Sequence, residues 1–195
     1  MKRLLRWLRF FLPECSLLLI GLYTFCLPDQ LFADPACTVL EDRDGNLLSA
    51  RIAADGQWRF PYNEKVPFRF KEALIQFEDR DFYEHPGVSS KAIARAVMQN
   101  SQAMEVKSGG STLTMQLARM MRKRKNRGLG DKLIESILAT RIEIRYSKEE
   151  ILAMYASNAP FGGNVVGLDA AAWRYFGRAA DKLSWAESAT LAVLP

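Results

Sequence analysis

The sequence contains few of the residues that build disulfide frameworks and metal sites. It has three cysteines and one histidine, His85, in 195 residues. Cys15 and Cys26 lie within an apolar N-terminal run, so only Cys37 belongs to the more polar chain that follows. A single thiol cannot form a disulfide within that part of the chain, and one histidine with one cysteine does not make a zinc site. We therefore predict no disulfide and no structural zinc.

The chain also lacks internal repeats and low-complexity segments, and its charge is close to balanced. Hydrophobic residues make up 49% of the sequence and aromatic residues 11%, which excludes a disordered chain. The net charge is +5, and Lys2, Arg3, Arg6 and Arg9 contribute four cations at the N-terminus. The remainder is nearly neutral and has the length of one ordinary globular domain.

An apolar run follows the four N-terminal cations, from Phe10 to Leu27, and is interrupted only at residues 13–16. A helix that spans a membrane needs about 17–25 residues, and basic residues before such a run are typical of a signal or a signal-anchor. No small-x-small cleavage site follows. We predict a cytoplasmic head at residues 1–9 and an uncleaved membrane anchor at 10–27; a buried helix of a soluble domain is the alternative.

Strand-like alternation is confined to a short region after the anchor. Asp44-Gly45-Asn46 separates two apolar runs, which predicts a β-hairpin, and Asp55-Gly56 marks a second turn. From Pro67 onward the apolar spacing is helical. We therefore predict a linker with a small β-hairpin at residues 28–66 and a helical domain at 67–195, which makes the fold mainly α.

Helix boundaries can be predicted within the helical domain. Pro67 can open a helix that carries Phe70, Leu74 and Phe77 on one face and ends at Glu78. Residues 131–145 form another helix, and its apolar stripe is Ile134, Leu138 and Ile142. Further caps are predicted at Ser90 and Ser111, capping boxes at Ser147 and Ser184, and a helix stop at Gly177.

The first polar segment of interest is E-D-R-D-F-Y-E-H-P-G, at residues 78–87. Three carboxylates and Arg80 stand in its first four positions, so repulsion between the acids can leave one of them poised to accept a proton. A solvated helix end is the alternative. His85 stands in a His-Pro-Gly turn, where a structural hydrogen bond is expected in place of base chemistry.

The second polar segment, G-G-S-T-L-T-M-Q-L-A-R, occupies residues 109–119. Its glycines let the backbone approach a ligand, and free N–H groups at a helix start favour anions. Gln116 and Arg119 follow along one side of that helix. The alternative is an ordinary capped helix without a ligand.

A basic cluster begins in this segment and points to an anionic ligand or surface. Lipid headgroups, a pyrophosphate and nucleic acid would all fit, and a solvated helix end is the alternative. Nucleic acid is disfavoured because the anchor places the cluster outside the cytoplasm. Lys132 and Glu135 share a helix face with opposite charges, either as a surface pair or as parts of a site. The cluster comprises Arg119, Arg122, Lys123, Arg124, Lys125, Arg127 and Lys132.

Taken together in this order, the segments resemble the glycosyltransferase family 51 domain, the peptidoglycan polymerase of class A penicillin-binding proteins and monofunctional transglycosylases. The resemblance runs from about residue 38 to Pro195. It rests on the patterns E-D-x-x-F-x-x-H-x-G, G-x-S-T-x-x-x-Q-x-x-K/R, R/K-K-x-x-E and K-x-x-I-L-x-x-Y-x-x-N, matched at residues 78–87, 109–119, 131–135 and 148–158. It implies a lysozyme-like helical fold and polymerisation of lipid II.

The resemblance also implies roles for particular residues. Glu78 corresponds to the general base that activates the 4-hydroxyl of the lipid II acceptor, and Glu135 to a second catalytic glutamate. Arg119 and Lys132 correspond to cations that neutralise the leaving undecaprenyl pyrophosphate. The remaining substrate-binding positions are Phe82, His85, Gly110, Ser111, Thr112, Gln116, Tyr155 and Asn158.

Two positions depart from the family patterns. Asp131 stands where a cation is usual, and its charge would weaken pyrophosphate binding if it lined the cleft; if it instead caps a helix, the cleft is unaffected. Ala156-Ser157 replaces the usual leucine-containing approach to Asn158. The sequence also lacks Ser-x-x-Lys, Ser-x-Asn and Lys-Thr-Gly, so we expect a truncated domain without a β-lactam-binding transpeptidase.

The expected partners are lipid II, the growing undecaprenyl-linked glycan chain and the bacterial inner membrane, with the catalytic domain on its outer face. Other cell-wall synthesis proteins are open candidates, as is a divalent cation such as Mg²⁺ or Mn²⁺. Two other functions stay open at this point. One is a lysozyme-like murein hydrolase, and the other is a non-catalytic membrane-anchored partner in cell-wall synthesis.

Overall fold

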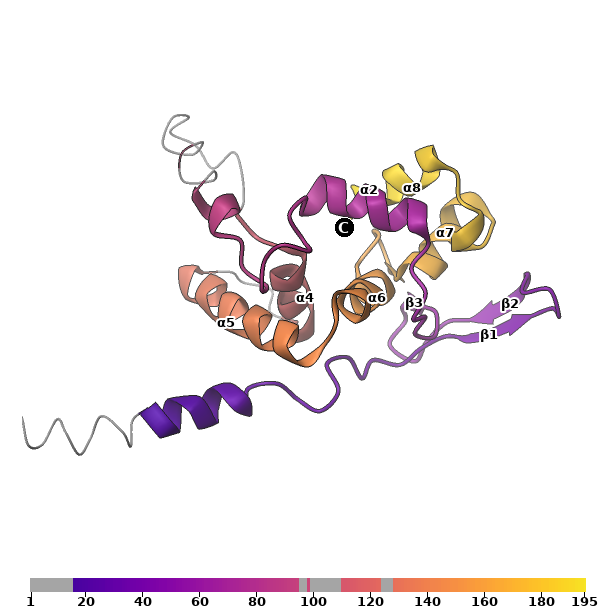
Figure 1. Ribbon diagram of the computed structural model, residues 1–195. Helices are drawn as coiled ribbons and strands as arrows, with labels where there is room; N and C mark the ends of the chain where they lie inside the picture. The colour runs from indigo at the N-terminus through magenta and orange to yellow at the C-terminus, as the bar shows by residue number, and fades with distance from the viewer. Residues whose placement is uncertain (1–15, 95–97, 99–109, 124–127) are drawn as a thin grey trace, which may run out of the picture.

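The computed structural model describes residues 16–94, 98, 110–123 and 128–195 and confirms a mainly helical chain with two small sheets (Figure 1). The labelled helices are α2 (Phe68–Glu78), α4 (Leu113–Arg122), α5 (Leu129–Arg145), α6 (Lys148–Asn158), α7 (Leu168–Phe176) and α8 (Trp185–Ala192), with a 3₁₀ turn at Ala180–Lys182. The strands are β1 (Thr38–Glu41), β2 (Leu47–Arg51), β3 (Trp58–Arg59) and β4 (Val165–Val166).

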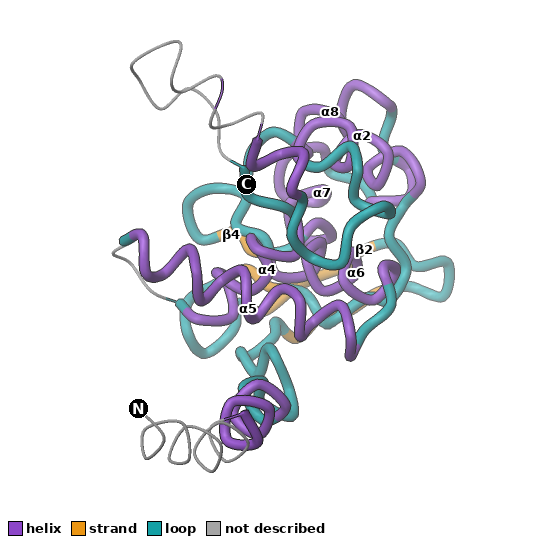
Figure 2. Tube along the Cα trace, turned by 60° about the vertical axis from the view of Figure 1, so that its left-hand side comes forward, coloured by secondary structure: helices purple, strands orange, loops and turns teal. Residues whose placement is uncertain are grey.

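Helix α6 forms the centre of the fold. Its residues 151–156 are all buried, and it packs against α4, α5 and α7. A helix that is apolar on all sides belongs in a core. On one side of it α2 packs against α8, and on the other α4 packs against α5 (Figures 1 and 2). Residues on α2, α4, α5 and α6 are thereby brought around one region of the molecule.

The predicted hairpin is confirmed. β1 pairs with β2 in antiparallel register, and the turn between them places Gly45 at φ +77°. Asp42 fixes that turn, because its Oδ1 accepts hydrogen bonds from the backbone N–H groups of Asp44 and Asn46, each at 2.8 Å. A second, parallel pair joins β3 to β4. The sequence did not predict β4, since two residues carry no readable alternation.

The N-terminal segment runs on the α5 side of the molecule (Figures 1 and 2), and hydrogen bonds connect it to α5. Residues 16–24 are helical, and the carbonyl groups near the end of that helix find donors on α5. Arg141 donates to the Thr24 carbonyl at 3.1 Å, and Arg145 to the Pro28 carbonyl at 2.8 Å. The Thr24 carbonyl ends the helix, where the last carbonyls have no partner within it, and Arg141 supplies its donor. The Pro28 carbonyl, in the loop that follows, receives its donor from Arg145.

In the part of the chain that the structure describes, no helix combines the length and the apolar character that a membrane crossing requires. The predicted cytoplasmic head, and residues 10–15 of the predicted anchor, lie outside that part. The anchor therefore stays a prediction.

Two predicted helix caps are displaced by one residue. Ser89, and not Ser90, accepts from the backbone N–H of Ala92 at 3.1 Å and begins the helix at 90–94. Thr112, and not Ser111, caps α4. In both places two hydroxyl residues stand side by side, and their spacing in the sequence does not decide between them. The capping boxes at Ser147 and Ser184 and the stop at Gly177 are confirmed.

The predicted apolar stripes are partly wrong. On α2, Phe70 and Leu74 are buried as predicted, but Phe77 is exposed and Ile75 is buried in its place. Positions 75 and 77 are both within one turn of Leu74, and packing against α8 selects between them. On α5, Leu138 and Ile142 are buried whereas Ile134 is exposed.

Gly87 allows α5 to approach the 78–87 segment, which gives a first prediction. Its φ is +91°, and a Cβ there would lie 2.7 Å from the carbonyl oxygen of Ala139. We expect Gly87→Ala to destabilise the protein by more than the backbone strain alone, which is about 1–2 kcal/mol. Gly45→Ala is the matched control, since its φ is also positive but a Cβ meets nothing within 4 Å. Chemical denaturation of both variants measures the difference, and equal losses would contradict the close approach.

Candidate active site

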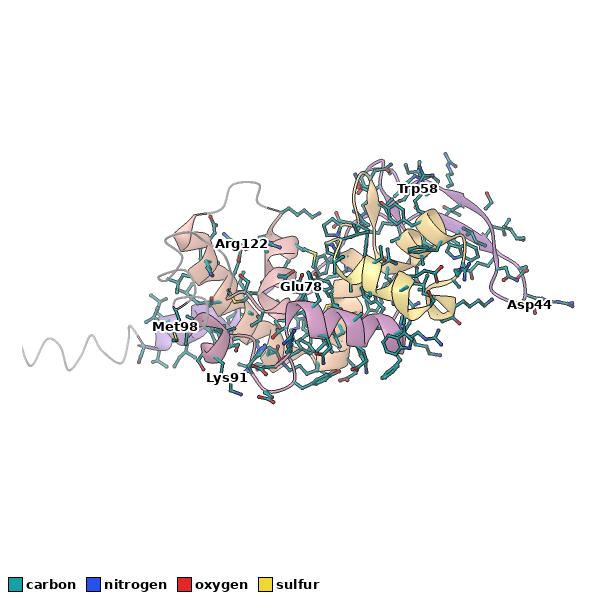
Figure 3. All side chains as sticks on the ribbon, turned by 90° about the horizontal axis from the view of Figure 1, so that it is seen from above. Asp44, Trp58, Glu78, Lys91, Met98 and Arg122 are labelled. Atoms are coloured by element: carbon teal, nitrogen blue, oxygen red, sulfur yellow. The ribbon has the colours of Figure 1, made fainter. Side chains whose placement is uncertain are left out.

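The centre of the candidate site is the carboxylate of Glu78, the last residue of α2 (Figure 3). Its Oε2 accepts a hydrogen bond of 2.5 Å from Nε2 of Gln116 on α4. The Gln116 Oε1 in turn accepts from the hydroxyl of Tyr155 on α6, at 3.1 Å. Glu78 itself is half-buried. Three helices therefore meet at one carboxylate that solvent can still reach.

Tyr155 sets the orientation of this chain of hydrogen bonds. Its side chain is 1% exposed, and burial, together with the negative charge of Glu78, raises the pKa of Tyr155 far above its ordinary value, although Arg119 opposes the shift. The hydroxyl therefore keeps its proton and acts as a donor. The Gln116 oxygen accepts the hydrogen bond from this hydroxyl, and the Gln116 NH₂ group faces Glu78, whose carboxylate oxygen can only accept.

Asp79 and His85 form a buried pair beneath Glu78. Both oxygens of Asp79 lie 3.0 Å from His85 Nε2, and Oδ2 also accepts from the backbone N–H of Leu113 at the start of α4. His85 Nδ1 accepts from the N–H of Gly87 at 3.2 Å, so Nε2 carries the proton that Asp79 accepts. The structural hydrogen bond predicted for His85 is confirmed. The imidazole is held inside the protein, which does not favour the substrate contact that the resemblance implies.

The other substrate positions of the first two segments are also mostly structural. Phe82 is fully buried and packs edge-on against the His85 ring. Thr112 is buried as the cap of α4, and its hydroxyl donates to the Gly87 carbonyl at 2.6 Å. A Cβ at Gly110 would lie 3.0 Å from Cα of Ile93, so this glycine permits close packing of the chain. Ser111 is half-buried at the start of the same segment.

Helix α5 brings the second predicted glutamate next to α4. Glu135 is 3% exposed, and Lys132 lies one turn before it. The two helices are in contact, and the Ser136 hydroxyl lies 3.9 Å from the sulfur of Met115. A buried carboxylate needs compensating partners, so Glu135 is a strongly constrained group. Glu135 lies on α5, which packs against α4, and Glu78 is linked to α4 by its hydrogen bond with Gln116.

Part of the predicted basic cluster has structural partners. Arg122 pairs with Asp131 at 2.8 Å, and Lys123 forms an ion pair with Asp34. Arg119, on the same helix as Gln116, lies near enough to Tyr155 to act on the pKa of Tyr155. Arg124, Lys125 and Arg127 lie outside the described residues.

Asp131, which departs from the family pattern, is the third residue of α5 and bonds back to the N-cap residue Gly128. Its Oδ2 accepts from the backbone N–H of Gly128 at 3.1 Å, and Oδ1 takes the ion pair with Arg122. The carboxylate is therefore engaged at the helix N-terminus with its charge balanced, which supports the capping alternative.

Asn158 is not joined to the Glu78 group by any hydrogen bond among the described residues. Its amide donates to the carbonyl of Met154 at 2.8 Å. It lines a cavity of about 390 Å³ between α6 and the segment that follows the N-terminal helix. The role that the resemblance implies for Asn158 therefore has no geometric support, whereas Tyr155 lies at the site.

Sequence reasoning missed the residues that support the site from below. Three helices are connected to the 78–87 segment by the side chains of Lys148, Glu143 and Thr114. Of these three residues, only Lys148 could have been singled out from the sequence, because it begins the fourth pattern. Among the described residues, no group of three or more histidine, cysteine, aspartate or glutamate side chains is arranged to hold a metal ion. The divalent cation stays a prediction.

Comparison with known proteins identifies the family. A sequence model of the family described as Transglycosylase matches residues 44–195. The chain belongs to the transglycosylase family. Penicillin-binding protein 1C of Escherichia coli (strain K12) is 45% identical over 163 residues, which cover 83% of this chain. Penicillin-binding protein 1A of Aquifex aeolicus (strain VF5) is 34% identical over 91% of the chain, and penicillin-binding protein 1F of Bacillus subtilis (strain 168) 32% identical over 92%.

These relatives are much longer proteins. The transglycosylase chain corresponds to 21% of penicillin-binding protein 1C, 26% of the Aquifex protein and 25% of the Bacillus protein. The likeness therefore concerns the transglycosylase part of those relatives. The family agrees with the resemblance found in the sequence.

The cap at Asp131 gives a second prediction. Asp131→Arg removes the acceptor for Gly128 and places two guanidinium groups together, so we expect a loss of about 0.5–2 kcal/mol in the free energy of unfolding. Asp131→Asn is the control, because its amide oxygen can still accept from Gly128, and it should lose less. Urea denaturation of both variants measures this. An Asp131→Arg variant as stable as the parent would show that the cap is dispensable.

Proposed function

We propose that this domain is an inverting peptidoglycan glycosyltransferase that polymerises lipid II into glycan strands. Family membership supports the reaction class, and one observation carries the assignment to residues. Glu78 is a half-buried carboxylate, fixed on one oxygen by Gln116, at the meeting point of three helices. A general base must be positioned before its proton affinity can be used, and this carboxylate is positioned.

In the proposed reaction, Glu78 accepts the proton of the acceptor's 4-hydroxyl while that oxygen bonds to the anomeric carbon of the growing chain. The bond from the anomeric carbon to the pyrophosphate breaks, and undecaprenyl pyrophosphate leaves with the bonding electrons. Gln116 donates to Oε2, so Oε1 has no donor among the described residues and can face the acceptor. In the Glu78 carboxylate, Oε2 is thus held by Gln116, and Oε1 is the oxygen that takes the proton.

The leaving group carries negative charge, and cations that stabilise it lower the barrier. Arg119 projects from the exposed side of α4 one turn after Gln116, and Lys132 lies on the neighbouring α5. We assign pyrophosphate neutralisation to these two side chains. Glu135, buried on α5, is assigned as the second glutamate, which acts on the donor side. The proposal includes a lysozyme-like arrangement, supported by a carboxylate at a helix end within a mainly helical domain.

Membrane attachment is part of the same proposal. Exposed aliphatic side chains cover the helix at 16–24 and the neighbouring face of α5, where a soluble surface would be polar. Arg141 joins α5 to the end of this helix, and Arg145 joins α5 to the loop that follows it. We infer that this face meets the lipid phase that holds lipid II. Its exposed members are Leu17, Leu18, Leu19, Ile20, Leu22, Leu133 and Ile137.

A third prediction tests the base. Glu78→Gln keeps the volume of the side chain but cannot take a proton, so polymerisation should fall about 10²–10⁴-fold. Glu72→Gln, on the same helix, is the matched control and should keep parent activity. The assay incubates the full chain in detergent with labelled lipid II and separates glycan strands on gels, with a thermal melt to verify folding.

Turnover close to that of the parent in a folded Glu78→Gln protein would overturn the assignment of the base. Release of soluble disaccharides from finished murein by the parent would instead identify a hydrolase. A parent that binds lipid II but forms no glycan would identify a non-catalytic partner.

A further inference from the structure

A buried ammonium group lies beneath the 78–87 segment, at the first residue of α6. Lys148 Nζ is 2.8 Å from the Glu143 carboxylate and 2.8 Å from the carbonyl oxygen of His85. It also lies over the ring of Phe82, 4.4 Å from the ring centroid. The side chains of Lys148 and Glu143 are only 19% and 7% exposed. The ion pair is therefore largely, though not completely, shielded from solvent.

The ion pair joins all the elements that form the candidate active site. Glu143 belongs to α5 and also accepts a 2.5 Å hydrogen bond from the Thr114 hydroxyl on α4. Lys148 begins α6, and its two other contacts belong to the 78–87 segment. Glu78 opens that segment, while Gln116 and Tyr155 lie on α4 and α6. One cation therefore connects the three helices to the chain that leaves the proposed base.

The interaction holds the backbone of the segment, whereas other contacts hold its side chains. Asp79 and Gly87 fix the two ring nitrogens of His85, but the His85 carbonyl receives its donor from Lys148. The face of the Phe82 ring is electron-rich and attracts the same cation. Without Lys148, the buried Glu143 would lose its counter-charge and the carbonyl its donor.

We propose that Lys148 is a positioning residue for the transfer reaction: its ion pair with Glu143 fixes the 78–87 segment and so the direction in which Glu78 meets Gln116. Lys148 touches no reacting atom, because its described contacts are all with protein groups below the site. The inference rests on the proposed function. It adds that the Lys148–Glu143 ion pair must hold the 78–87 segment in place for Glu78 to meet Gln116 correctly.

The test compares Lys148→Met with a matched exposed pair. Methionine has a similar length without charge, so kcat on lipid II should fall about 10–10²-fold through misplacement of Glu78, with KM changed less than about 2-fold. Lys91→Met is the control, because Lys91 pairs with Glu84 in the same part of the chain but both side chains are largely exposed. That variant should keep parent kinetics.

A double variant separates positioning from stability. Lys148→Met/Glu143→Gln removes the unpaired buried charge but still leaves the His85 carbonyl without a donor. Its melting temperature should recover relative to Lys148→Met while kcat stays low. Lys148→Arg, which keeps a cation, should restore part of kcat. Recovery of kcat together with stability in the double variant would show a purely structural role and overturn the proposal.

An NMR measurement, which does not depend on activity, tests this inference separately from the proposed function. His85 is the only histidine in the sequence, so its imidazole gives one assignable NMR signal. That signal should shift or broaden in Lys148→Met and stay unchanged in Lys91→Met. An unchanged signal, or parent kcat in folded Lys148→Met, would overturn the positioning role. If the signal moves while the parent itself makes no glycan, the proposed function fails and the support beneath Glu78 stands.

Discussion

The hydrogen bond from the Gln116 amide to the Glu78 carboxylate is the interaction on which the rest of the site depends. Its direction follows because a carboxylate oxygen accepts the bond from the Gln116 amide nitrogen, while the buried Tyr155 hydroxyl donates to the amide oxygen. A carboxylate at the end of a helix is otherwise free to rotate. Here one oxygen is fixed from α4 and α6, and the geometry of the proposed proton transfer follows from that constraint.

The fold supports this constraint with polar groups that are buried and paired. Asp79 ties the segment after Glu78 to the first turn of α4, and Lys148 ties it to α5 and α6. Such networks are costly when one member is missing, because a buried group is then left unsatisfied. Such networks therefore hold the site in one arrangement, but they tolerate few substitutions. Family membership and the chemistry of lipid II polymerisation fit a site built in this way.

The sequence predicts local features well and tertiary partners poorly. The hairpin at Asp44-Gly45, the capping box at Ser147 and the end of α2 at Glu78 depend on neighbours in the sequence, and each was predictable. The resemblance indicated Gln116 and Tyr155 as important, but as substrate contacts. That they support Glu78 depends on the packing of α4 and α6, which no spacing within either helix encodes.

The kinetics of a Gln116→Leu variant test the central claim most directly, because they separate positioning of the base from binding of substrate. Leucine keeps the bulk of the side chain and removes both hydrogen bonds. If Gln116 positions Glu78, kcat on lipid II should fall about 10–10²-fold while KM stays within about 2-fold of the parent, and Tyr155→Phe should show the same pattern more weakly. A raised KM with kcat unchanged would contradict the account and make Gln116 a substrate contact.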